Sequence, residues 1–187
     1  MNNHSPSRHD AFTQGLHWAT AVLVVAAFIY GLGGSEARVY LPARDFERSL
    51  HETLGMGVFA LTLLRLLWRG FATRPAEEAG TEWMRRGAGA VQIALYGLLL
   101  AVPATAVAGA WLQGHTVLLL GGTEIASLVA PSYDVGNTVA EIHTWLGDAI
   151  VWIAGAHAVA AIAHHVLLKD GVLLSILPSW LPLKRRP

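Results

Sequence analysis

Four histidines lie inside or at the edge of long apolar segments, at positions that suggest binding in pairs. They are His17, His51, His143 and His157. The last two lie on one segment, 14 residues apart. Because 14 residues are close to four turns of an α-helix, both rings face the same side, about 21 Å apart along the axis. One ring would then lie near each face of a bilayer core about 30 Å thick.

The composition is that of an integral membrane protein. The chain has 187 residues, of which 53% are hydrophobic and 14% charged, and its mean hydropathy is +0.44. Its net charge is zero, which gives no electrostatic support for nucleic-acid binding. It has no cysteine, which excludes disulfides, thiolate-ligated or covalently attached haem, and iron–sulfur clusters.

Four apolar runs predict the elements that must position these histidines. They cover about residues 12–33, 49–68, 89–112 and 139–168, and each is long enough to cross a bilayer as a helix. Pro103 lies inside the third run and predicts a kink there. Residues 113–138 are predicted to form a loop that dips into the membrane interface. We therefore expect an all-α fold, an integral membrane four-helix bundle that forms a single domain over residues 1–187.

Basic residues predict the orientation of this bundle. If the N-terminus is cytoplasmic, only Arg38, Arg44 and Arg48 of the 13 lysines and arginines face the outside. Cytoplasmic loops carry an excess of Lys and Arg, so the pattern favours four spans with both termini inside.

Depth in the membrane then assigns the histidines to two pairs. His17 and His157 would lie toward the inner face, and His51 and His143 toward the outer face. Each pair offers two imidazoles, whereas zinc usually takes three or four protein ligands. A porphyrin supplies four nitrogens of its own, so two axial histidines complete an iron site. The pattern predicts two haem b groups, each held by two histidines.

A small residue follows each of these histidines at the fourth position. Since residues four apart share a helix face, the pattern predicts faces left clear for a flat macrocycle. Small residues also serve helix packing in membranes, so both interpretations remain open. The four residues are Ala21, Gly55, Gly147 and Ala161.

Three other residues are candidates for supporting roles. Arg65 shares a face with His51 at the depth of the inner haem, and Arg48 lies one turn before His51. Either guanidinium could pair with a haem propionate, or Arg65 could simply extend to the interface. His164 shares a face with His157, about 10 Å closer to the cytoplasm. It could exchange protons with a quinone, or only hydrogen-bond the helix end.

Several stretches resemble the bacterial cytochrome b561 family, the four-helix di-haem membrane cytochromes. Relatives often have histidines early in the third helix, where this chain has Gly89 and Gln92. The similarity covers roughly residues 8–178. The matching stretches are Leu16-His17-Trp18, Leu50-His51-Glu52-Thr53-Leu54-Gly55, Arg65-Leu66-Leu67-Trp68-Arg69, Glu141-Ile142-His143-Thr144, and Gly155-Ala156-His157 through His164-His165 to Lys169-Asp170-Gly171-Val172-Leu173 and Leu177-Pro178.

The resemblance implies a bacterial inner-membrane protein with two b haems bound at His17, His51, His143 and His157. It also implies electron transfer between a donor on the outer side, either superoxide or a periplasmic redox partner, and the quinone pool. The nearest-looking relatives suggest superoxide oxidation coupled to ubiquinone reduction. Others suggest a cytochrome b anchor for a dehydrogenase or hydrogenase. A histidine-lined metal or proton transporter is a more distant alternative from the residues alone.

Overall fold

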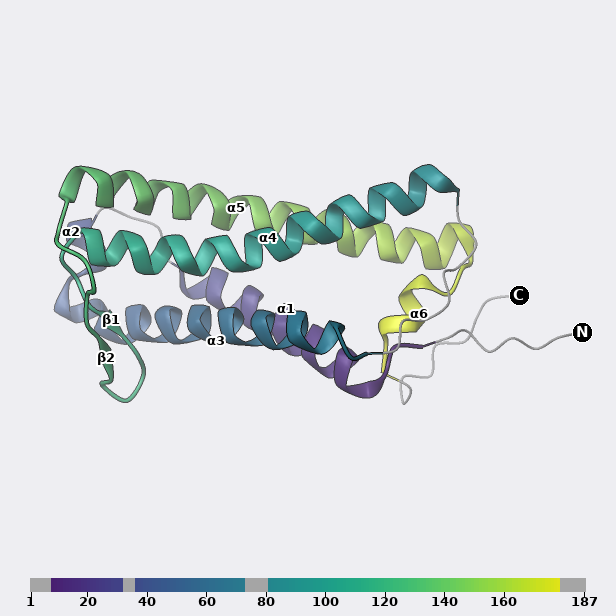
Figure 1. The fold of residues 1–187 in the computed structure, drawn as a ribbon, viewed down its shortest axis with the longest axis horizontal. Coiled ribbons are helices and arrows are strands. Elements are labelled where there is room, and N and C mark those ends of the chain that lie inside the picture. The colour runs from purple at the N-terminus through teal and green to yellow at the C-terminus, as the bar shows by residue number, and fades with distance from the viewer. Residues whose placement is uncertain (1–7, 32–35, 73–80, 179–187) are drawn as a thin grey trace, which may run out of the picture.

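The computed structural model describes residues 8–31, 36–72 and 81–178. Four long helices run side by side along the molecule (Figure 1). They are α1 (Ala11–Tyr30), α3 (Asp45–Arg69), α4 (Glu82–Leu112) and α5 (Tyr133–Ala163). Each lies in a helical stretch long and apolar enough to cross a membrane. This confirms the prediction of an all-α fold with four spans. The predicted single domain over residues 1–187 extends beyond the described residues. Four of the basic residues used for the orientation lie outside them, namely Arg74, Lys184, Arg185 and Arg186.

Helix boundaries differ from the apolar runs because polar turns extend beyond the apolar part of a helix. α4 begins at Glu82 rather than near residue 89, and α5 begins at Tyr133 rather than near residue 139. α1 ends at Tyr30, although the apolar run continues to about residue 33. Two short helices precede α3, namely α2 (Glu36–Val39) and η1 (Pro42–Arg44). α4 remains one helix through the buried Pro103.

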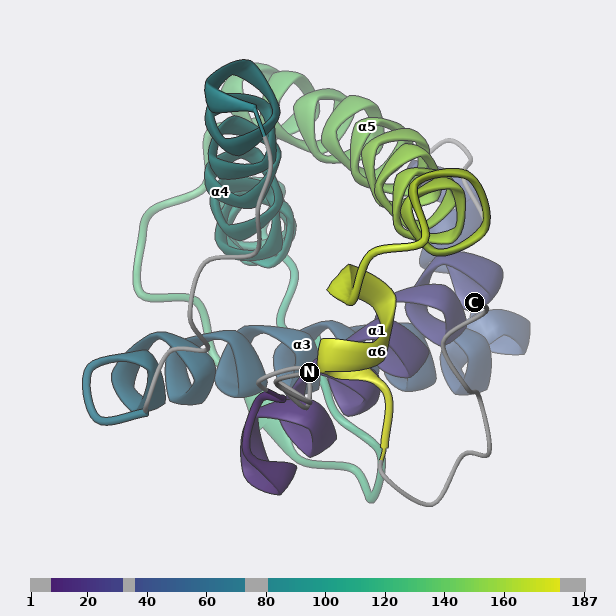
Figure 2. The ribbon, with the colours of Figure 1, turned by 90° about the vertical axis from the view of Figure 1, so that its right-hand side faces the viewer.

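The bundle consists of two helix pairs. α1 packs along α3 and α4 packs along α5, while α3 and α4 share a smaller contact. Figure 2 shows the pairs end-on, with α4 and α5 opposite α1 and α3. Halfway along the bundle, Val58, Leu99 and Ile150 form a buried cluster. This apolar layer separates the two ends, so any sites at the ends are formed by different residues.

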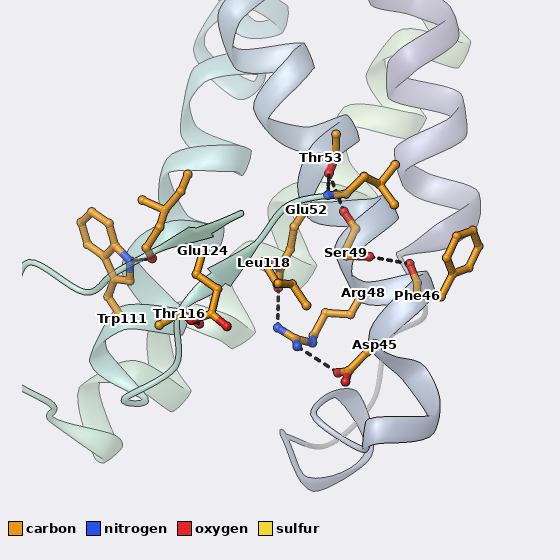
Figure 3. A network of polar contacts seen from close by, with 12 residues as sticks. Asp45, Phe46, Arg48, Ser49, Glu52, Thr53, Trp111, Thr116, Leu118 and Glu124 are labelled. Atoms are coloured by element: carbon orange, nitrogen blue, oxygen red, sulfur yellow. Dashed lines mark hydrogen bonds and ion pairs between the residues drawn. The ribbon is translucent and has the colours of Figure 1, made fainter. Parts of the chain in front are cut away.

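The end that carries the 113–132 connection is called the hairpin end below. Within the predicted loop, β1 (Val117–Leu118) and β2 (Glu124–Ile125) pair antiparallel, with Val117 opposite Ile125. Gly121 and Gly122 form the turn at positive φ, which glycine adopts without steric cost. Two backbone N–H groups of this hairpin bind α3: that of Leu118 donates to Glu52, and that of Leu120 to Thr53 (Figure 3).

The opposite end, called the termini end, contains the start of α1 and the last described elements. η2 (His164–Leu168) is a π-helical turn that continues α5, and α6 (Val172–Ile176) follows it. Figure 2 shows α6 turning back across this end toward α1. The indole of Trp18 donates to the Ile176 carbonyl at 3.0 Å, and the Gln14 amide donates to Ser175 at 3.2 Å. α6 is therefore attached to α1.

Close approach of α4 and α5 depends on small residues near the hairpin end. A Cβ at Gly136 would lie 2.8 Å from the backbone nitrogen of Gln113, and one at Gly109 would lie 3.2 Å from that of Ala140. We expect Gly136→Ala to lower the free energy of unfolding by about 1–3 kcal/mol, because the backbones must separate. Thermal denaturation in detergent measures this. Gly87→Ala, in open space on α4, is the matched control; equal midpoints for both variants would contradict the expectation.

Candidate functional site

His51 and His143 face each other at the hairpin end. Their ring centroids are 6.1 Å apart and the ring planes meet at 76°. His51 comes from α3 and His143 from α5, which belong to different helix pairs. Two metal–nitrogen bonds of about 2 Å each, plus the distance from each nitrogen to its ring centre, add to about 6 Å. The separation therefore fits one metal ion between two imidazoles.

Backbone carbonyls hold both rings in the form that binds a metal. Nδ1 of His51 lies 2.8 Å from the Ala27 oxygen, and Nδ1 of His143 lies 2.9 Å from the Val102 oxygen. Because a carbonyl only accepts, each Nδ1 carries the proton and each Nε2 keeps its lone pair. A hydrogen bond from the second ring nitrogen is the usual support of a histidine that binds metal.

The Ala27 carbonyl is available because α1 ends there. The last four carbonyls of a helix lack partners within it, and the Gly31 N–H bonds Phe28 instead of Ala27. The imidazole of His51 uses this open carbonyl. Gly31 leaves room for it, since a Cβ at that position would lie 2.9 Å from Cε1 of His51. The end of α1 thus positions a ligand on α3.

A cavity of about 720 Å³ adjoins the two histidines. Its lining includes Gly55 and Gly147, and a Cβ at either glycine would meet no atom within 4 Å. The cavity lies in the size range of sites for cofactors and small ligands. Two of the four small residues singled out in the sequence therefore border open space beside the facing rings, as a macrocycle there would require.

Arg48, at the mouth of this cavity, is engaged mainly by carboxylates. Its guanidinium lies 3.0 Å from Asp45 and 3.4 Å from Glu52 (Figure 3), and 5.1 Å from the centre of the Tyr40 ring. Tyr40 in turn stacks on His115 at 3.5 Å. Nε of Arg48 is buried and has no hydrogen-bond partner within the described residues.

The termini end arranges His17 and His157 differently. His157 is exposed on α5, whereas His17 is half-buried on α1. Nδ1 of His17 lies 3.3 Å from a guanidinium nitrogen of Arg65. Since a guanidinium only donates, this Nδ1 accepts, and a neutral ring then carries its proton on Nε2. This is the opposite tautomer to that of His51 and His143, so the two rings do not form a ready ligand pair. Of the small residues, Ala21 and Ala161 are half-buried at this end.

Two guanidiniums meet one aromatic ring beside His17. Arg65 lies 5.3 Å and Arg69 lies 5.9 Å from the centre of the Tyr96 ring. Such cation–π contacts stabilise the charges modestly. Within residues 8–31, 36–72 and 81–178, no carboxylate forms an ion pair with either arginine. The pair can therefore receive an acidic group.

His164 opens the π-helical turn and is half-buried. Its Nδ1 lies 2.5 Å from the Asp170 carboxylate. The structure therefore gives this histidine an acidic partner that the sequence analysis did not consider.

A metal bound by protein side chains alone has little support. In the part of the chain that the structure describes, no three His, Cys, Asp or Glu side chains gather closely enough to hold a metal ion. The facing pair His51 and His143 would need further ligands from a bound group, and porphyrin nitrogens are such ligands.

Comparisons with known proteins identify the family of this chain. The sequence profile described as prokaryotic cytochrome b561 matches residues 8–179. The chain belongs to the prokaryotic cytochrome b561 family. The family implies haem b as the cofactor and electron transport as the general role, and the four apolar helices make this cytochrome a multi-pass membrane protein.

The alignments with individual relatives cover most of both chains. The chain is 25% identical over 174 residues to cytochrome b561 homolog 2 of Escherichia coli K12, covering 92% of this chain and 93% of that protein. It is 26% identical to the probable superoxide oxidase CybB of Yersinia pestis, covering 92% and 97%. It is 32% identical to cytochrome b562 of Cereibacter sphaeroides, covering 87% and 90%.

Sequence reasoning missed two residues that contribute to these arrangements in the cytochrome. Gly31 gives space to His51, and its only signal was a glycine near the end of an apolar run. Asp170 lies within a stretch quoted for the family resemblance, but nothing local indicated that its carboxylate turns back to His164. His51, the partner of Gly31, is distant along the chain. His164, the partner of Asp170, lies across a π-helical turn.

Proposed function

We propose that this cytochrome binds two haem b groups and carries electrons across the bacterial inner membrane, from superoxide outside to ubiquinone inside. The observation that carries the proposal is the facing pair of His51 and His143, 6.1 Å apart and each with Nε2 available. Bound haem would supply one-electron transfer, which no side chain of this chain offers at such a site.

His51 and His143 would hold the outer haem, with Gly55 and Gly147 leaving its plane clear. Arg48 lines the cavity, and its guanidinium would pair with a propionate of this haem. The buried apolar cluster of Val58, Leu99 and Ile150 would separate this haem from the inner one.

His17 and His157 would hold the inner haem, and their support is matched depth and the small residues Ala21 and Ala161. Arg65 would have to release Nδ1 of His17 so that Nε2 becomes free to bind. Its guanidinium, with that of Arg69, would then turn to a propionate, since charge-assisted pairs are stronger than the contact to a neutral imidazole.

The substrates are proposed from orientation and from one relative. Lysines and arginines near the termini end favour a cytoplasmic position for that end, so the cavity of the hairpin end would open outward. The relative from Yersinia pestis is named a probable superoxide oxidase, and Arg44 lines the cavity near its mouth. Two superoxide anions supply the two electrons that ubiquinone takes up with two protons to become ubiquinol, and dioxygen is released.

Stopped-flow mixing of the oxidised holoprotein with superoxide tests the proposal. We expect the α-band of reduced haem to appear after mixing with superoxide and to disappear when a soluble ubiquinone is added. Superoxide dismutase in the superoxide syringe is the control and should abolish the first phase. Haem that stays oxidised with superoxide, yet is reduced by ubiquinol, would instead support the role of an anchor for a partner dehydrogenase or hydrogenase.

A further inference from the structure

The segment after α5 closes on itself through a ring of hydrogen bonds. Nδ1 of His164 lies 2.5 Å from the Asp170 carboxylate, and the His164 carbonyl accepts the Asp170 N–H at 3.3 Å. Between them, Lys169 has a left-handed backbone with φ of 53°. The turn His164–Leu168 is π-helical, a rare geometry that is frequent at functional sites. Backbone and side chains together thus hold the imidazole against the carboxylate.

Asp170 is also fixed from its other side. Its second oxygen accepts the N–H of Val172 at 3.1 Å, at the first residue of α6. α6 is attached to α1 through Trp18 and Gln14. The side chains of His164 and Asp170 are 28% and 23% exposed, so the protein does not fully enclose the pair. The carboxylate therefore has a set position at the termini end, on the side from which the proposed quinone must take its protons.

We propose that Asp170 is a positioning residue that makes His164 the proton carrier for ubiquinone; this rests on the proposed function. A carboxylate only accepts, so Nδ1 of His164 carries a proton and Nε2 is left to exchange one. A carboxylate on Nδ1 holds an imidazole in one tautomer and one orientation.

In the proposed cycle, the His164 ring takes up one proton and passes it on. Nε2 takes a proton from water at the termini end, which forms the imidazolium beside the Asp170 carboxylate. Nε2 then gives this proton to a quinone oxygen, and the neutral ring returns. Two such cycles accompany the two electrons that convert ubiquinone to ubiquinol. Neither His164 nor Asp170 changes over a complete turnover.

Comparison of a proton-requiring and a proton-independent acceptor tests the inference. The purified holoprotein is reduced without oxygen and mixed with decylubiquinone or with ferricyanide, which takes an electron and no proton. We expect His164→Ala and Asp170→Asn to slow reoxidation by the quinone about tenfold or more, in the range of general acid–base groups. Reoxidation by ferricyanide and the haem content should stay at the wild-type values.

Asp170→Asn is the decisive variant, because asparagine keeps the size and an accepting oxygen of aspartate but not its charge. Its quinone rate at the wild-type value, with only Asp170→Ala lowering the thermal midpoint, would overturn the inference and leave Asp170 a structural residue. His165→Ala, at the next position of the same turn, is the matched control and should behave as wild type. A wild-type protein that ferricyanide reoxidises and the quinone does not would instead overturn the proposed function itself.

Discussion

His51→Ala and His143→Ala should each abolish binding of the same haem and leave about one haem per chain. The reason is that each variant removes one of two facing imidazoles, and half of the axial ligands cannot hold the group against loss to detergent. His17→Ala and His157→Ala should each abolish binding of the other haem. Pyridine haemochrome content and the position of the α-band measure this, because two haems in different surroundings absorb differently.

His165→Ala is the control for this series, since it removes a helix-end histidine that belongs to neither proposed pair. It should retain both haems. If His17→Ala and His157→Ala lost different haems, the pairing by depth would be wrong. A wild-type protein with one haem per chain after careful purification would contradict the second haem site. His17 would then keep the tautomer of the structure, in which Nδ1 accepts from Arg65.

Gly55→Leu and Gly147→Leu should each lower occupancy of the outer haem and leave the inner haem in place. Both glycines border the cavity, and a Cβ at either position would meet no protein atom within 4 Å. A leucine would therefore fill the space of the macrocycle, and overpacking of this kind typically costs about 1–3 kcal/mol. Haem content and the outer α-band, measured in the purified variants, give the result.

Alanine at the same positions separates volume from helix packing. Gly55→Ala and Gly147→Ala add one carbon in open space and should keep most of the outer haem. Gly97→Leu is the matched control. Gly97 lies on α4, where an added Cβ also meets open space, but it does not line the cavity. Unchanged outer-haem spectra in both leucine variants would mean that the small residues serve the helices alone.

The sequence by itself determined the number of spans and predicted the depth of each histidine in the membrane. In lipid, each backbone polar group must be paired within its own segment, so a span is a local helix of about 20 apolar residues. Counting along such a helix gives depth directly, at 1.5 Å per residue. The four apolar runs therefore predicted α1, α3, α4 and α5. They did not predict the first turns of α4 and α5, because these turns are polar.

Only the tertiary structure decided which helix faces meet. A helix that is apolar all round carries no preferred inner face, so the sequence could place His51 and His143 at one depth but could not turn them toward each other. The carbonyl of Ala27 and the space beside Gly31 depend on where α1 ends against α3. The contact of His164 with Asp170 depends on a π-helical turn that has no periodic signal. Contacts between helices, which no local pattern encodes, set the tautomers of His17, His51 and His143 and with them the chemistry of these rings.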